Sequence, residues 1–205
     1  NQLGSYSTAL GRAALAVSNP TTASNMFNVA VGYGAGEALT TGKENTVVGS
    51  AALDADVLGS QSTAIGYAAL SSYNDTGGAT NTNNVAVGYN AGAALTTAVQ
   101  CTLIGGSAGS AAAMTGDNNV AVGYVAGNAL TSGAGNTLIG AQAGDNIQTG
   151  NQSTFIGYNL DAQAVDNNRE IVIGSNGTGA GDDTVRFVTS SASATLNLDG
   201  SDTSW

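Results

Sequence analysis

Acid–base chemistry in this chain would have to rest on carboxylates, because its 205 residues include no histidine. Two carboxylates placed on either side of a glycosidic bond can hydrolyse it. Two candidate pairs lie close together in the sequence, Glu37 with Glu44 and Asp54 with Asp56. No acidic position recurs at a regular spacing, and solvated loop charges account for all four residues. We therefore expect that the chain is not an enzyme.

Two further groups of residues could hold a metal ion, and a third, glycine-rich segment could hold a phosphate. Asp117-Asn118-Asn119 and Asp182-Asp183 supply the oxygen ligands that Ca²⁺ favours, but both lack the phrase of known calcium repeats. Gly32-Tyr-Gly-Ala-Gly36 is as rich in glycine as a phosphate loop but lacks the spacing of the dinucleotide fingerprint. The sequence therefore predicts no metal and no cofactor. Cys101 is the single cysteine, so no disulfide can form within the chain.

Five tyrosines share one position, directly after a glycine that recurs through the chain. A tyrosine ring can stack on a sugar and offer its hydroxyl group, so a carbohydrate-binding stripe is one interpretation. Packing between subunits or over a turn is the other. The candidates for receptor or subunit contact are Tyr33, Tyr67, Tyr89, Tyr124 and Tyr158.

These tyrosines belong to a repeated phrase of nine residues, of which Asn28 to Gly36 and Asn119 to Gly127 are typical copies. Most of the recurring glycines are 17 residues apart, so each copy is one unit of a stacked repeat. Two longer intervals predict loops that leave the stack, one around Asn19-Pro20 and one over Asn74 to Asn83. The recurring glycines are Gly11, Gly32, Gly49, Gly66, Gly88, Gly105, Gly123, Gly140, Gly157 and Gly174.

Short β-strands are predicted directly before the recurring glycines. The residues one and three places before each glycine are almost all Val, Ile or Thr, and the residue between them is mostly Ala. Alternation puts the two β-branched positions on one face of the strand and the middle position on the other. Frequent glycine and β-branched residues argue against a helical repeat. The sequence predicts an all-β fold, a parallel β-roll or β-solenoid of about ten 17-residue coils.

Other positions of the phrase predict the rest of each coil. An alanine recurs three places after the glycine, and an apolar residue seven places after it is expected to form the opposite wall. Asn or Ser opens most copies and is expected to bond to nearby backbone and to stack as a ladder. Each coil would then hold two short strands around a narrow core of Ala, Val and Ile. The wall residues are Leu39, Leu95, Leu130 and Ile147.

A roll with so thin a core would be only marginally stable as a single chain, and we predict that its repeated faces pair in a homotrimer. The net charge of −10, with four basic residues, disfavours nucleic acid and anionic membrane surfaces as partners. No apolar run is long enough to span a membrane, and no signal peptide is evident. Because the chain opens at Asn1 and soon enters the repeat, we expect an attachment region upstream of it.

The phrases Asn-Val-Ala-Val-Gly-Tyr-x-Ala-Gly and Asn-Thr-x-Ile-Gly-x-x-Ala-Gly resemble repeats of bacteriophage tail fibres. They are also similar to the head repeats of trimeric autotransporter adhesins, which are shorter than 17 residues. The resemblance covers residues 7–175 and implies a trimeric, left-handed β-roll. After an expected loop over 175–184, residues 185–189 and 194–198 alternate like two closing strands. This end resembles the stretch before the self-cleaving chaperone of phage fibres, whose own motif is absent here.

The resemblance implies a structural and adhesive segment of a homotrimeric tail fibre that contacts a glycan or protein on the host cell. Residues 1–175 would form the β-roll domain and residues 176–205 a small β capping segment. Other virion proteins would bind through the upstream region, and the location would be the virion. The alternatives are the head of a bacterial trimeric adhesin at the cell surface and a virion decoration protein. An ice-binding face is disfavoured because Val interrupts the Thr positions.

Overall fold

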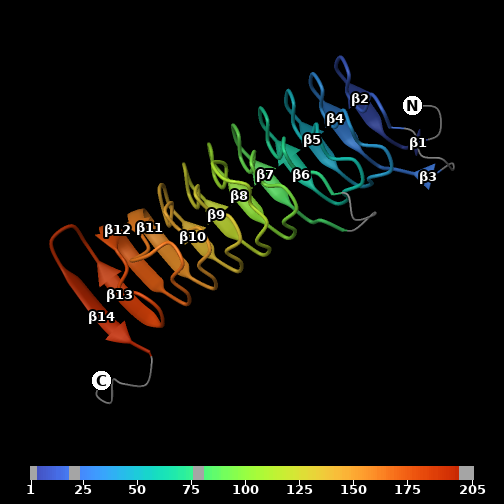
Figure 1. Ribbon diagram of the computed structural model, residues 1–205. Coiled ribbons are helices and arrows are strands. Elements are labelled where there is room, and N and C mark those ends of the chain that lie inside the picture. Colours follow the sequence, from blue (N-terminus) through green and yellow to red (C-terminus); the bar gives the residue numbers. More distant parts are fainter. Residues whose placement is uncertain (1–3, 19–23, 76–80, 199–205) are drawn as a thin grey trace.

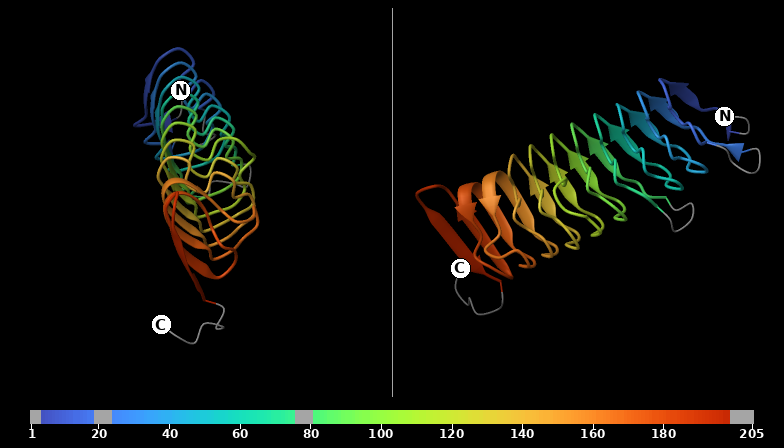
Figure 2. Two further views of the ribbon diagram at one scale, coloured as in Figure 1. Left: turned by 90° about the vertical axis from the view of Figure 1, so that its left-hand side faces the viewer. Right: turned by 45° about the horizontal axis from the view of Figure 1, so that its top comes forward.

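The chain folds into a rod of stacked coils, seen in a computed structural model that describes residues 4–18, 24–75 and 81–198 (Figure 1). No helix occurs in these ranges, and the strands lie in a row along one side of the rod (Figure 2). The predicted all-β solenoid of about ten coils is therefore confirmed. The loop expected around Asn19-Pro20 lies outside the described residues, as does the middle of the loop expected over Asn74 to Asn83.

One sheet of twelve strands runs the length of the rod, in the order β14-β13-β12-β11-β10-β9-β8-β7-β6-β5-β4-β2. Its strands up to β13 pair in parallel, so that Leu138 lies beside Phe155. The regular coils contribute three-residue strands: β2 (Thr8–Leu10), β4 (Val29–Val31), β5 (Thr46–Val48), β6 (Thr63–Ile65), β7 (Val85–Val87), β8 (Thr102–Ile104), β9 (Val120–Val122) and β10 (Thr137–Ile139).

The two ends of the rod depart from this pattern. At the N-terminal end, β1 (Gly4–Ser5) and β3 (Ser24–Asn25) form a separate parallel pair. At the other end, β11 (Thr154–Asp161) and β12 (Ile171–Thr178) lengthen to eight residues, so the loop expected from residue 175 is wrong at its start. The two expected closing strands are present as β13 (Thr184–Val188) and β14 (Ser193–Asn197), which pair antiparallel.

The middle residue of each strand from β4 to β12 points into the rod and is completely buried. The β-branched residues on either side of it share the opposite face, as the alternation predicts, and that face points outward. The expected core of Ala, Val and Ile is confirmed for Ala, but the isoleucines of the strands lie outside it. The coil is narrow, so the core takes mostly Ala and Leu. The buried middle residues are Ala30, Val47, Ala64, Ala86, Leu103, Ala121, Leu138, Phe155 and Val172.

The opposite wall carries the predicted buried apolar residues but not the predicted second strand. Leu39, Leu95, Leu130 and Ile147 are all buried against the strands. This wall consists of turns and isolated bridges, such as the one between Leu95 and Met114. Its backbone still bonds from coil to coil, since the Thr131 N–H donates to the Gln148 carbonyl at 2.9 Å.

Glycine is required at the recurring position after each strand. Gly88 has a φ of +140°, and a Cβ there would lie 2.5 Å from the carbonyl oxygen of Gly105 in the next coil. Both the backbone conformation and the close approach of the next coil therefore exclude a side chain. The same turn also places the tyrosines directly after the strand.

A ladder of buried side chains runs beside the strands at the position that opens each phrase, and it confirms the prediction. Each asparagine oxygen accepts from the backbone N–H of the next coil, as from Asn136 to Ser153 at 2.9 Å. Each side-chain amide donates to a carbonyl 14 residues ahead, as from Asn136 to Gly150 at 2.8 Å. The ladder consists of Asn28, Asn45, Ser62, Asn84, Cys101, Asn119, Asn136, Ser153 and Glu170.

Candidate functional site

The most extensive candidate site is the outer sheet face, which we define as the outward β-branched residues and Phe187 of strands β4 to β13. Its isoleucines Ile65, Ile104, Ile139 and Ile156 keep 37–40% of their surface exposed, whereas the inward residue directly before each of them is fully buried. An apolar stripe that follows every coil is unusual for a surface in contact with water alone. Its apolar members are Val29, Val31, Val48, Ile65, Val85, Val87, Ile104, Val120, Val122, Ile139, Ile156, Ile171, Ile173, Val185 and Phe187.

The predicted tyrosines lie along the rim of the outer sheet face and keep 53–65% of their surface exposed. The rings of Tyr33, Tyr89 and Tyr124 pack on the coil before them. Tyr89 stacks on Tyr67 with ring centroids 5.5 Å apart, and the Arg12 guanidinium lies 5.6 Å from the Tyr33 ring centroid. Tyr124 covers the small residue Gly106, where an added Cβ would be 3.5 Å from its ring. Packing over a turn is thus part of their role, and the exposed surface of each ring remains free for a partner.

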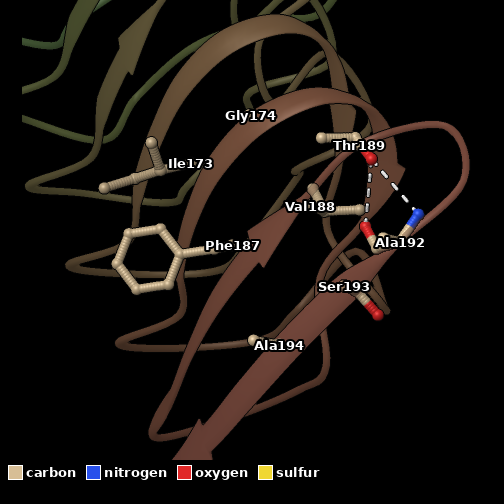
Figure 3. Close-up of a pocket in the computed structure, with 8 residues that line it drawn as sticks. All are labelled: Ile173, Gly174, Phe187, Val188, Thr189, Ala192, Ser193 and Ala194. Carbon is tan, nitrogen blue, oxygen red and sulfur yellow. Dashed lines mark hydrogen bonds between the residues drawn. The ribbon is translucent and has the colours of Figure 1, made fainter.

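A hollow of about 430 Å³ ends the outer sheet face near the C-terminus (Figure 3). Ile173 and Phe187 flank it on one side and the β13–β14 turn on the other. Thr189 holds this turn, since its Oγ1 accepts from the Ala192 N–H at 3.1 Å. The lining is almost entirely apolar, and Phe187 is half exposed. The hollow therefore continues the outer sheet face and belongs to the same surface.

Two side chains close the C-terminal end of the rod interior. Glu170 is buried at the end of the ladder, and its Oε1 accepts from the Gly181 N–H at 2.7 Å. Arg186 stands at the middle position of β13, where earlier strands carry an apolar residue. Its guanidinium donates to the carbonyls of Thr178 and Gly179 at 2.8 and 2.9 Å. Polar groups with backbone partners thus replace the apolar filling where the stack ends.

The candidate carboxylates interact mainly with groups on neighbouring coils. Burial, with a contribution from the negative charge of Glu37, raises the pKa of Asp54, which is 17 residues away. Glu44 accepts from the side-chain amide of Gln61 at 2.9 Å, again 17 residues on. Asp56 is fully buried, and burial raises its pKa to about 6. The expectation that all four carboxylates are solvated loop charges is therefore wrong for Asp56. Stacking sets residue i beside residue i+17, so the neighbours of these carboxylates come from the next coil.

The structure adds a carboxylate pair that the sequence prediction missed. Asp145 and Asp161 lie on neighbouring coils, and their carboxyl groups are close enough to interact. Burial and the neighbouring Asp161 carboxyl raise the pKa of Asp145 to about 6. Their spacing of 16 residues, close to the period, is the signal that could have found them.

Carboxylate oxygens of both candidate calcium groups already accept hydrogen bonds from the protein itself. Asp117 accepts from the Val99 N–H at 2.9 Å, and Asp182 accepts from the Asn168 N–H at 2.6 Å. Arg169 donates to Asp183 at 2.7 Å and lowers the pKa of that carboxyl. Within residues 4–18, 24–75 and 81–198, no three Asp, Glu, Cys or His side chains are grouped to hold a metal ion.

The remaining sequence candidates are structural. Gly32, Gly34 and Gly36 adopt positive φ angles in the turn after β4. Cys101 occupies the ladder, and burial raises its pKa to about 11, which keeps the thiol protonated at neutral pH. In the part of the chain that the structure describes, no helix is long and apolar enough to cross a membrane. Comparison with protein-family models, curated proteins and solved structures gives no match to this chain.

Proposed function

We propose that this chain is a structural and adhesive rod, a segment of a homotrimeric bacteriophage tail fibre that contacts the host cell surface. The observation that carries the proposal is the outer sheet face, which exposes β-branched apolar side chains in coil after coil. Three left-handed rolls with parallel axes would turn these faces toward one another. The resemblance of the repeat to phage fibres supports the assignment to that class of assembly.

Burial of the outer sheet face between chains would add buried apolar surface, of which the narrow interior of one coil holds little. Each square ångström of apolar surface removed from water contributes about 25 cal/mol. The strands that carry Ile65, Ile104 and Ile139 bury a single inward residue, Ala or Leu, and leave an isoleucine of equal or larger size outside. A closed, symmetric set of copies covers a repeated apolar face without leaving an edge for further growth.

The same proposal assigns roles to the ends and to the surroundings of the rod. The β13–β14 hairpin, with Glu170 and Arg186 beneath it, would be the β cap of the roll. An upstream region would bind other virion proteins, and the chain would be located in the virion. It would carry out no catalysis, bind no nucleic acid and insert in no membrane.

The oligomeric mass of the purified chain tests this proposal. One chain has a mass of 19.9 kDa, so light scattering should give about three times that value. Replacing Ile65, Ile104, Ile139 and Ile156 by Thr keeps β-branched residues in every strand but removes apolar surface. We expect this variant to be a folded monomer with an unchanged circular dichroism spectrum. The matched control replaces Thr63, Thr102, Thr137 and Thr154 on the same strands by Val and should remain trimeric.

The head of a bacterial trimeric adhesin and a virion decoration protein share this expected mass. Neighbouring genes separate these alternatives. Baseplate or tail genes beside this one would support the phage fibre, and a coding region for a membrane anchor downstream would replace it with the adhesin. A monodisperse wild-type monomer would overturn all trimeric assignments.

A further inference from the structure

A polar groove of about 470 Å³ crosses four coils at the corner where the chain enters the strands. This corner lies at the opposite end of each strand from the tyrosine rim. We call it the amide groove and define it by the residues that line it. These are Asn118, Ala134, Gly135, Asn151, Gln152, Asn168 and Arg169. With neighbouring coils ~4.8 Å apart, the groove is roughly 14 Å long.

The groove exists because one side chain is missing from a column of long polar residues. Five places before the recurring glycine, successive coils carry Gln100, Asn118, Gly135, Gln152 and Arg169. All five adopt the left-handed conformation, with φ between 55° and 71°. Gly135 has the same backbone geometry as its neighbours, so the turn itself does not require a glycine there. Its effect is to open a gap between Asn118 and Gln152.

The floor of the amide groove is rigid because its polar groups already have partners. Asn168 Oδ1 accepts from both the backbone N–H and the side-chain amide of Asn151, each at 3.0 Å. Asn151 Oδ1 accepts in turn from the Ala134 N–H at 2.9 Å. These bonds run from coil to coil and fix the two asparagines in place.

The walls, by contrast, offer unused hydrogen-bonding groups. The side-chain amides of Asn118 and Gln152 are exposed and make no hydrogen bond within the described part of the chain. Each carries two donors and an acceptor, the set that matches the neighbouring hydroxyl groups of a sugar. Arg169 uses its Nε and Nη2 atoms on Asp183 and therefore brings little net positive charge to the groove.

From this chemistry we propose that the amide groove binds a neutral, polyhydroxylated ligand, a glycan chain of the host surface. Apolar ligands are disfavoured because the lining is mainly amide, and anionic glycans are disfavoured by the nearby carboxylates and the net charge of −10. The identity of the ligand as a host glycan rests on the proposed function. In a trimer, three grooves on one rod would strengthen a weak single-site interaction through avidity.

The substitution Gly135→Gln tests the groove directly. An added Cβ at Gly135 has its nearest neighbour at 3.6 Å, an ordinary contact, and glutamine already occupies this backbone conformation at Gln100 and Gln152. The variant should therefore keep the mass and spectrum of the wild type while its new side chain fills the gap, with a modest fall in melting temperature because the left-handed backbone is less favourable for a residue with a Cβ than for glycine. The control Gln100→Ala changes the same column outside the groove.

The binding assay uses immobilised neutral oligosaccharides built from glucose, galactose, mannose and N-acetylglucosamine, with sialylated and sulfated ones beside them. We expect the wild type and Gln100→Ala to bind neutral members, and Gly135→Gln and Gln152→Ala to bind at least about tenfold more weakly. Wild-type retention by anionic members alone, by no member, or equally by wild type and Gly135→Gln overturns the proposal. A trimer that binds no neutral glycan would leave the rod proposal intact, and a monomer that binds through the groove would refute only the trimer.

Discussion

The inner and outer faces of the same sheet differ in what they bury and in what they leave to water. On the inner face, one residue per strand is fully covered, and it is often as small as Ala64 or Ala121. On the outer face, two residues per strand are β-branched, and side chains such as Ile139 remain more than one-third exposed. Two of the three side chains of each short strand from β4 to β10 thus lie where a single chain leaves them partly exposed.

This difference indicates that the inner face stabilises the folded single chain and that the outer face is available for association between chains. The inner face, together with the side-chain ladder and the opposite wall, holds one coil on the next within a single chain. The outer face contributes little to that stacking and is available for association. Substitutions on the two faces should therefore separate the stability of the monomer from the stability of the assembly.

The largest expected effect on the monomer comes from the inner face. Leu138→Ala removes a fully buried side chain that lies against Gly144 of its own coil and Gly127 of the preceding coil. The free energy of unfolding should fall by about 2–5 kcal/mol, because the narrow coil cannot collapse onto the cavity. Urea unfolding followed by circular dichroism measures it, in the background of the fourfold Ile→Thr variant. A loss below about 1 kcal/mol would show that the inner face is not the core of the monomer.

The interior also holds one titratable group whose charge opposes folding. Burial raises the pKa of Asp56 from 3.8 to about 6 in the folded chain, so the folded state binds more protons than the unfolded state between these values. The free energy of unfolding should therefore rise by about 2.4 kcal/mol as the pH falls from 7 to 4. The raised pKa values of Asp54 and Asp145 act in the same direction.

Asp56→Asn is the matched variant, since its side-chain oxygen can still accept from the N–H groups of Gly59 and Asp75. It should remove most of the dependence on pH. Unfolding curves at several pH values provide the measurement. A stability that falls on acidification over this range would contradict the assignment.

A smaller effect is expected from the ladder. Asn136→Ala leaves the N–H of Ser153 and the carbonyl of Gly150 without their buried partners and should cost about 2 kcal/mol. Asn136→Ser should cost about half as much, because Ser153 already occupies this position and accepts from the next N–H at 3.2 Å. The same unfolding assay ranks the two variants, and the reverse order would exclude hydrogen bonding as the cause.

The smallest effect on the monomer is expected on the outer face. Ile139→Thr keeps a β-branched residue at an exposed strand position, so the unfolding free energy of the dilute monomer should change by less than about 0.5 kcal/mol. Its effect should appear in the assembly, as a weaker trimer in light scattering. A large loss of monomer stability without any change of mass would assign Ile139 to the fold of the single chain.

Most of the fold could be predicted from the sequence because each position of the repeat occurs in about ten copies, so its preferred residue types can be compared. The strands, the turn glycine, the buried ladder and the opposite wall follow from residue types at fixed offsets. Which face of the sheet is turned toward the interior of the rod could not be predicted in this way. In β4, β6, β7 and β9, Val, Ile or Thr lies outside and Ala inside, the reverse of the usual hydrophobic pattern, and the narrow width of the coil decides which face is buried.

The candidate sites were less predictable because they depend on neighbours across coils. Glu37 beside Asp54 and Asp145 beside Asp161 follow from the period, whereas pairing by sequence distance joined Asp54 to Asp56. The tyrosines were found from their offset, but the packing of Tyr124 on Gly106 requires the stack. The amide groove depends on a gap at Gly135, which is visible in the sequence only after its column has been aligned.

The most direct test of the separation between the two faces is thiol labelling of one residue on each. Ile139→Cys is made in a Cys101→Ser background, since serine occupies the same ladder position at Ser62 and Ser153. In this variant, the thiol should react slowly at high protein concentration and faster on dilution, because the assembly covers it. Wild-type Cys101 should react only on unfolding, and Gln148→Cys, exposed on the opposite wall, should react rapidly throughout. Equal, rapid labelling of Ile139→Cys at every concentration would contradict the account, because the outer sheet face would then be free of any partner.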